Sequence, residues 1–197
     1  FIIFIAAALE LQAQGCSDAG VCKLGSLKPD PNYTKVQHDN LLDAGFSVGA
    51  ADYGVTVFGG HIGYSRQFGE NWSIDTKATF LSQNGNEVSV IGLGHIFANI
   101  NYKISQKLTL TGGVKVPLMK ADRKEDGNPL PMDYQSSLGT FDLLAGIRYN
   151  PENWQWALAV QIPLQQNENA FFPGSFPAGS MINDIQATNA FQRQADI

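Results

Sequence analysis

Two histidines each stand four residues before another polar side chain, His61 before Ser65 and His95 before Asn99. On an extended strand, residues four apart share a face. Nucleophilic catalysis also needs the base within hydrogen-bond reach of the nucleophile and a third group that orients the base. A zinc site would need further His, Cys or carboxylate ligands at fitting spacing. We therefore interpret both histidines as polar lining and expect no enzymatic activity, no metal and no other cofactor.

Five ionisable residues fall on the same, less apolar face of the predicted strands. They carry charges of both signs: Asp75, Lys77, Lys115, Asp142 and Arg148. In a narrow barrel, mixed charges pair and fill the interior, whereas in a wide barrel they line a channel and tune its selectivity. Both alternatives stay open from the sequence. We predict that these five line a lumen together with the two histidines.

Strands with alternating apolar and polar positions must position these residues. The clearest are the arms of a hairpin at 139–164, each about 11 residues long, which matches the length a tilted strand needs to cross a bilayer. The alternation begins at Leu41 and recurs to residue 195, giving about eight strands. It predicts a set of aliphatic and aromatic side chains that point outward to lipid: Phe58, Ile62, Ile74, Ile100, Val114, Leu143, Leu158 and Val160.

The connections predict two unlike ends. Short turns are expected at one end and longer loops at the other: turns at 69–71, 105–107 and 150–153, loops at 82–90, 119–138 and 165–187. Outer-membrane barrels show this asymmetry. Aromatic residues gather near the expected turns, as an interfacial girdle requires: Phe68, Trp72, Tyr102, Tyr149, Trp154 and Trp156. A soluble barrel with an apolar interior would show the same alternation. We predict an all-β fold, an antiparallel transmembrane β-barrel over 41–197.

The N-terminal residues 1–14, FIIFIAAALELQAQ, have the apolar run and small-residue end of a secretory signal peptide that lacks its first part. A short buried helix is the alternative. Cys16 and Cys22 follow, and after a secretion signal a disulfide between them is expected, with lipidation of Cys16 or two free thiols as alternatives. The polar residues 15–40 then form a periplasmic segment or a small plug.

The last run, through Phe191, Arg193 and Ala195, is short and polar for a membrane strand. We therefore expect a C-terminally truncated piece of a larger barrel, with a gap beside the first strand or a frayed final strand. Unpaired edges are costly in hydrocarbon, so an intact barrel would have further strands. Net charge is −5 and 16% of residues are charged, which argues against a nucleic-acid partner.

The segment PLPMDYQSSLGTFDL at 129–143, together with GCSDAGVC at 15–22, resembles the outer-membrane transporters of Bacteroidetes-type bacteria. This group is related to the phenol-degradation (meta-pathway) barrel family and distantly to the fatty-acid channel family. The resemblance covers most of 15–197. It implies a porin-like barrel in a Gram-negative outer membrane that moves small, often hydrophobic, molecules, and it carries over no catalytic residue.

One loop is unusually apolar for an outside loop. It runs from Ala170 to Ala178 and holds Phe171, Phe172 and Phe176. Folding over the barrel mouth as a ligand entry would hide these rings, and contact with lipopolysaccharide is the alternative. The predicted partners are therefore outer-membrane lipid, lipopolysaccharide and a small solute, and the predicted function is passage of that solute. The alternative function is a structural or adhesive barrel with a filled lumen.

Overall fold

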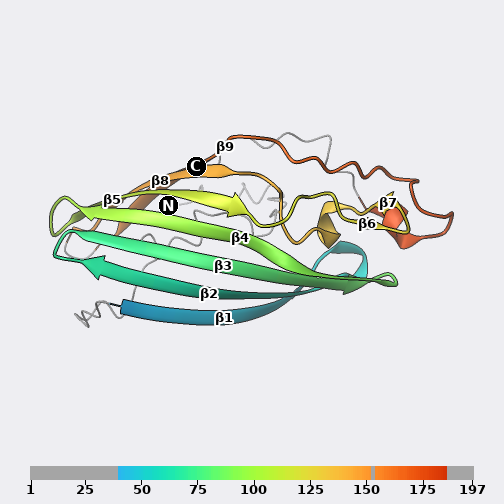
Figure 1. The fold of residues 1–197 in the computed structure, drawn as a ribbon, viewed down its shortest axis with the longest axis horizontal. Helices are drawn as coiled ribbons and strands as arrows, with labels where there is room; N and C mark the ends of the chain where they lie inside the picture. The colour runs from blue at the N-terminus through green and yellow to red at the C-terminus, as the bar shows by residue number, and fades with distance from the viewer. Residues whose placement is uncertain (1–39, 152–153, 186–197) are drawn as a thin grey trace, which may run out of the picture.

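The structure, a computed structural model, describes residues 40–151 and 154–185 and is all-β (Figure 1). Seven antiparallel strands lie side by side in one sheet in the order β1-β2-β3-β4-β5-β8-β9. Their bounds are β1 (Asn40–Ala50), β2 (Thr56–Phe68), β3 (Trp72–Gly85), β4 (Val88–Lys103), β5 (Leu108–Pro117), β8 (Asp142–Tyr149) and β9 (Trp156–Pro163). The all-β, antiparallel prediction is therefore confirmed.

Short elements lie in the connections. A two-stranded ladder pairs β6 (Lys124–Glu125) with β7 (Asn128–Pro129). The described residues also form three 3-10 turns: η2 (Asp52–Gly54), η3 (Met132–Tyr134) and η4 (Met181–Asp184). Over residues 40–151 and 154–185, no helix has the length and apolar character needed to cross a membrane.

The sheet does not close into a barrel within this part of the chain. β1 is paired with β2 and β9 with β8, and neither has a second neighbour among the described residues. The predicted last run, with Phe191, Arg193 and Ala195, lies outside these residues. So do the predicted signal peptide and the Cys16–Cys22 disulfide.

The sheet has two chemically different faces. We call the face that carries Lys115 and Asp142 the inner face, because both residues are fully buried there. The predicted alternation is present in every long strand. Of the set expected to point outward, Phe58, Ile62, Ile100, Leu143 and Leu158 are 43–60% exposed, and Ile74, Val114 and Val160 share their face and are half-buried.

The two ends of the sheet differ as the sequence predicts, except at the β3–β4 connection. The tight connections β2–β3, β4–β5 and β8–β9 lie at one end, and the long segments after β5 and β9 gather at the other, beside β6 and β7 (Figure 1). The aromatic residues near the tight connections are exposed: Phe68, Trp72, Tyr102, Tyr149, Trp154 and Trp156. The rings of Trp72 and Tyr102, which are cross-strand partners, lie 4.5 Å apart.

The prediction of a loop at 82–90 is wrong. β3 continues to Gly85, β4 starts at Val88, and only Asn86 and Glu87 turn the chain. Both turn residues have positive φ, 50° and 67°, the combination that lets a two-residue turn follow the twist of the strands. The polar residues at 82–84 are strand residues, paired with β4 from Ser82↔Ile91 onward.

The hairpin at 139–164 is confirmed, but its arms are shorter than expected. β8 and β9 have 8 residues each and pair from Asp142↔Pro163 to Tyr149↔Trp156. Proline has no N–H to donate to a ladder, so Pro163 ends the arm. Beyond Pro163, one further backbone hydrogen bond, from Leu164 N to Phe141 O at 2.8 Å, joins the two arms of the hairpin.

Candidate functional site: the polar inner face

The seven residues predicted to line a lumen all lie on the inner face, in two groups. His95, Lys115 and Asp142 are buried, with 1%, 0% and 0% of their surface exposed. The other four are half-buried: His61, Asp75, Lys77 and Arg148. We call the half of the inner face on β4, β5, β8 and β9, which holds the three buried residues, the packed half, and the half on β1 to β3, where His61, Asp75 and Lys77 are partly exposed, the open half.

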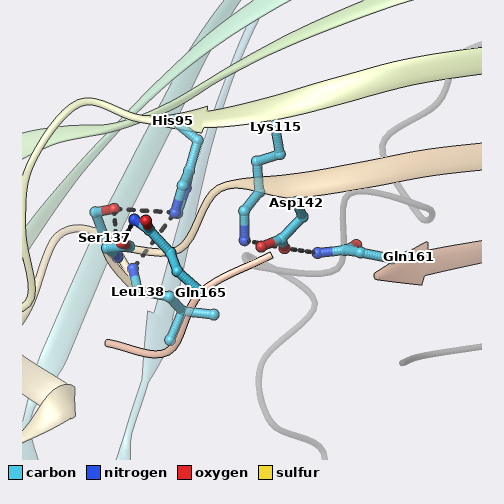
Figure 2. Close-up of polar contacts among 8 residues, drawn as sticks. His95, Lys115, Ser137, Leu138, Asp142, Gln161 and Gln165 are labelled. Atoms are coloured by element: carbon cyan, nitrogen blue, oxygen red, sulfur yellow. Dashed lines mark hydrogen bonds and ion pairs between the residues drawn. The ribbon is translucent and has the colours of Figure 1, made fainter. Parts of the chain in front are cut away.

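An ion pair lies at the centre of the packed half. Lys115 on β5 and Asp142 on β8 are register partners, and Lys115 Nζ lies 2.7 Å from Asp142 Oδ2. Gln161 on β9 donates from Nε2 to the same carboxylate oxygen. Figure 2 shows the three side chains in a row across the three strands. Burying two charges is favourable only with close contact and further hydrogen bonds, and this row supplies both.

His95 contacts the segment that follows β7. Its Nε2 lies 3.0 Å from Ser137 Oγ and 3.4 Å from the backbone N of Leu138 (Figure 2). Because a backbone N–H donates to it, Nε2 is the acceptor nitrogen and the proton is on Nδ1. Ser137 Oγ accepts in turn from Gly139 N at 3.0 Å. Both side chains are almost fully buried, so this His–Ser contact anchors a loop rather than presenting a nucleophile to a substrate.

A third cluster lies on the open half. His61 on β2 donates from Nε2 to Asp43 Oδ2 on β1 at 3.0 Å, and Lys77 Nζ on β3 lies 3.9 Å from the same oxygen. Two glycines make room for these side chains. A Cβ on Gly45 would lie 2.5 Å from the His61 ring, and one on Gly63 would lie 2.1 Å from Asp43 Oδ1. The side chains therefore lie flat across the neighbouring strands.

The polar chain continues toward the tight connections. Asn101 on β4 donates from Nδ2 to Asp75 Oδ2 at 2.5 Å and to Ser73 Oγ at 3.1 Å. Its Oδ1 accepts from Thr111 Oγ1 on β5 at 2.7 Å. Arg148 lies further along the same face, with Nη2 3.5 Å from Thr109 Oγ1. The inner face is thus a hydrogen-bonded polar surface over most of the sheet.

The structure brings His61 neither to Ser65 nor to His95. His61 contacts Asp43 rather than Ser65, and β3 separates it from His95 on β4. Among residues 40–151 and 154–185, no group of three His, Cys, Asp or Glu side chains has a geometry that could hold a metal ion.

The long segments 118–141 and 164–185 fold back over the inner face at the loop end, and we call them the loop-end cap. Their apolar side chains pack on Val88 and Val90 of β4 and on Val55. The cap residues in this cluster are Leu130, Tyr134, Phe171, Ile182 and Ile185, with Phe176 at its edge. Of the three rings expected to be hidden, Phe171 is fully buried and Phe176 half-buried, but Phe172 is 59% exposed.

Amides hold the cap in place. Gln83 on β3 donates to Gln135 O at 2.8 Å, and the Gln135 side chain donates to Leu130 O at 2.9 Å. Asn169 Nδ2 bridges the carbonyls of Ala121 and Leu130, at 3.1 and 2.9 Å. These bonds satisfy backbone groups that would otherwise be buried without a partner. The cap is therefore an ordered structure.

The hydroxyl of Tyr134 joins the cap to the β3–β4 turn. It donates to Gly85 O at 2.9 Å and accepts from Asn86 Nδ2 at 3.1 Å. Tyr134→Phe should lower the free energy of unfolding by about 1–3 kcal/mol, because it leaves these groups without the hydroxyl. Urea unfolding in lipid vesicles measures this, and the exposed Tyr149→Phe is the control with a smaller expected loss.

Burial raises the pKa of the Tyr134 phenol above its ordinary 10.0, and Asp133 adds to the rise, although the bond from Asn86 opposes it. A raised pKa favours the protonated form in the folded chain. The stability that the Tyr134 hydroxyl contributes is therefore fully present below pH 10.0 and is lost as the pH rises above it. The difference in unfolding free energy between wild type and Tyr134→Phe should be constant up to that pH and then shrink. A constant difference throughout would contradict it.

Three functional residues are missing from the sequence-based set: Asp43, Ser137 and Gln161. Asp43 has the inner-face parity of its strand, which was a usable signal, but its partner His61 lies 18 residues away. Gln161 also stands at an inner-face position of its strand. Ser137 lies in a loop with no periodic pattern, so no sequence signal points to it.

Comparisons with protein-family models, with curated proteins and with solved structures gave no match. The fold and the geometry of the inner face are therefore the observations that bear on function.

Proposed function

We propose that the chain forms the wall of an outer-membrane β-barrel that lets small solutes pass along its polar inner face. The observation that carries the proposal is the sheet with two opposite faces. Its outer face exposes large apolar side chains that no other described residues cover, among them Leu42, Phe46, Ile62, Ile91 and Leu158, which are 59–91% exposed. Lipid is the partner that such a face fits, since in water it would be a large apolar patch.

The strand lengths and the aromatic residues support the same proposal. β1 to β5 have 10 to 16 residues, enough for tilted strands to cross a hydrocarbon core. The exposed aromatics at the tight connections would lie at one membrane interface. The hydrogen-bonded inner face would then line water, as in barrels with an aqueous lumen.

A structural barrel with a filled lumen is the second candidate. The buried Lys115–Asp142–Gln161 row and the loop-end cap favour it, because both occupy space on the inner face. The open Asp43–His61–Lys77 cluster favours passage. Planar-bilayer conductance of the purified chain tests the choice. Stepwise currents support passage, and insertion without current supports the filled barrel. Failure to float with lipid vesicles would contradict both.

A further inference from the structure

The charges on the inner face differ sharply in accessibility. The Lys115–Asp142 pair has no exposed side-chain surface, so it cannot meet a solute. On the open half, the side chains of Asp43, His61 and Lys77 are 43%, 33% and 19% exposed. A solute that moves along the inner face would therefore meet this cluster.

The cluster combines opposite charges on one oxygen atom. The carboxylate of Asp43 carries one negative charge, the ammonium of Lys77 one positive charge, and both lie near Asp43 Oδ2 with His61. The charges of Asp43 and Lys77 cancel. The exposed groups still offer both hydrogen-bond donors and acceptors.

We propose that the Asp43–His61–Lys77 cluster is a selectivity site for small neutral, hydroxyl-bearing solutes. This inference rests on the proposed function. Balanced charge gives neither cations nor anions an advantage, and the donors and acceptors replace the water that a hydroxyl group loses on entry. It differs from the hydrophobic cargo that the family resemblance implies.

The glycines beside the cluster support this role. Gly45 and Gly63 let the His61 and Asp43 side chains lie against the wall, because any Cβ there would collide with them. The two side chains of the cluster therefore lie along the sheet over Gly45 and Gly63. Neither glycine is required by a turn, since both lie inside continuous β1–β2 pairing.

Reversal potentials across a KCl gradient test the site. Asp43→Asn leaves the positive charge of Lys77 and should shift selectivity toward anions, and Lys77→Gln should shift it toward cations. One unit charge at 4 Å in water changes the permeability of a monovalent ion about fivefold, which corresponds to ~1 kcal/mol, and it does so in opposite directions for cations and anions. The control, Lys124→Gln, removes the same charge from an exposed position on β6 in the cap and should leave the cation-to-anion permeability ratio near that of wild type.

The outcomes separate this inference from the proposed function. Conduction by both variants with the cation-to-anion selectivity of wild type would overturn the selectivity site alone. A shift of that selectivity in the same direction in both variants would do the same. Absence of current from the wild-type chain would overturn the proposed function and this site together.

Vesicle swelling tests the solute class with three probes of similar size. Glucose, which is neutral, should enter wild-type vesicles faster than gluconate, an anion, and glucosamine, a cation at neutral pH. Faster entry of either charged probe in wild type would overturn the inference. In Asp43→Asn the rate for gluconate should approach that for glucose, and in Lys77→Gln the rate for glucosamine should do so.

Discussion

Replacing Lys115 with methionine should lower the free energy of unfolding by about 3–5 kcal/mol, the usual cost of removing one partner from a buried ion pair. Methionine has a similar length, so packing changes little. The cost comes from Asp142, which stays fully buried without the ammonium 2.7 Å from its carboxylate. Gln161 still donates to that carboxylate but carries no full charge. Urea unfolding in lipid vesicles measures the loss.

Two further variants isolate the cause. Lys77→Met makes the same change at an exposed ion pair with a 3.9 Å separation and should cost less than about 1 kcal/mol. Lys115→Met combined with Asp142→Asn removes both buried charges and keeps an acceptor for Gln161, so it should recover most of the stability. A loss in Lys115→Met no larger than that in Lys77→Met would show that the buried pair contributes nothing special.

The Lys115–Asp142 pair also fixes how β5 meets β8. The two residues are directly opposite in the ladder, at the end where pairing begins after the long segment 118–141. A slip by one residue would move Asp142 to the outer face, among apolar side chains. The pair therefore specifies the register of the strands on either side of the cap.

The strands were predictable from the sequence because their two faces differ in polarity. Leu158 and Ile147 pair on the outer face, and Gln161 and Leu144 pair on the inner one, so a period of two is visible in each arm. The signal failed at residues 82–84, where the outer position Ser82 and the inner position Gln83 are both polar. Strand pairing there depends on the Asn86–Glu87 turn, which lacks the glycine that usually marks such hairpins.

The sequence predicts which face of the sheet each site residue occupies, but it does not predict which side chains that residue contacts. Which face Lys115 occupies follows from its neighbours in the sequence. Its contact with Asp142 depends on the β5–β8 register across the long segment 118–141, which the alternation within either strand does not give. Ser137 contacts His95 from a segment in which Gly139, with φ of 68°, donates its N–H to Ser137 Oγ, and no periodic pattern indicates this geometry. The β-bulge between Ala78 and Phe80, where β4 carries an extra residue near His95, shifts the alternation of β4 by one residue, so that Leu93 and Ile96 both lie on the outer face.

Leu158→Arg should lower the free energy of unfolding in lipid vesicles by about 2–4 kcal/mol, the cost of an arginine near the middle of a bilayer. Leu158 lies in the interior of β9, opposite Ile147, and 60% of its surface is exposed on the outer face. In the proposed barrel this exposed surface meets hydrocarbon, where a guanidinium loses its hydration. The measurement is equilibrium unfolding by urea in vesicles.

Ser65→Arg is the matched control, because it introduces the same side chain on the inner face. Ser65 is half-buried on β2 and is the register partner of Asp75, so an arginine there has water and a carboxylate beside it. It should cost less than about 1 kcal/mol. Since both variants add one arginine to a strand, the intrinsic strand preference of arginine cancels in the comparison. Equal costs at the two positions would mean that the outer face does not meet hydrocarbon, and the membrane assignment would be abandoned.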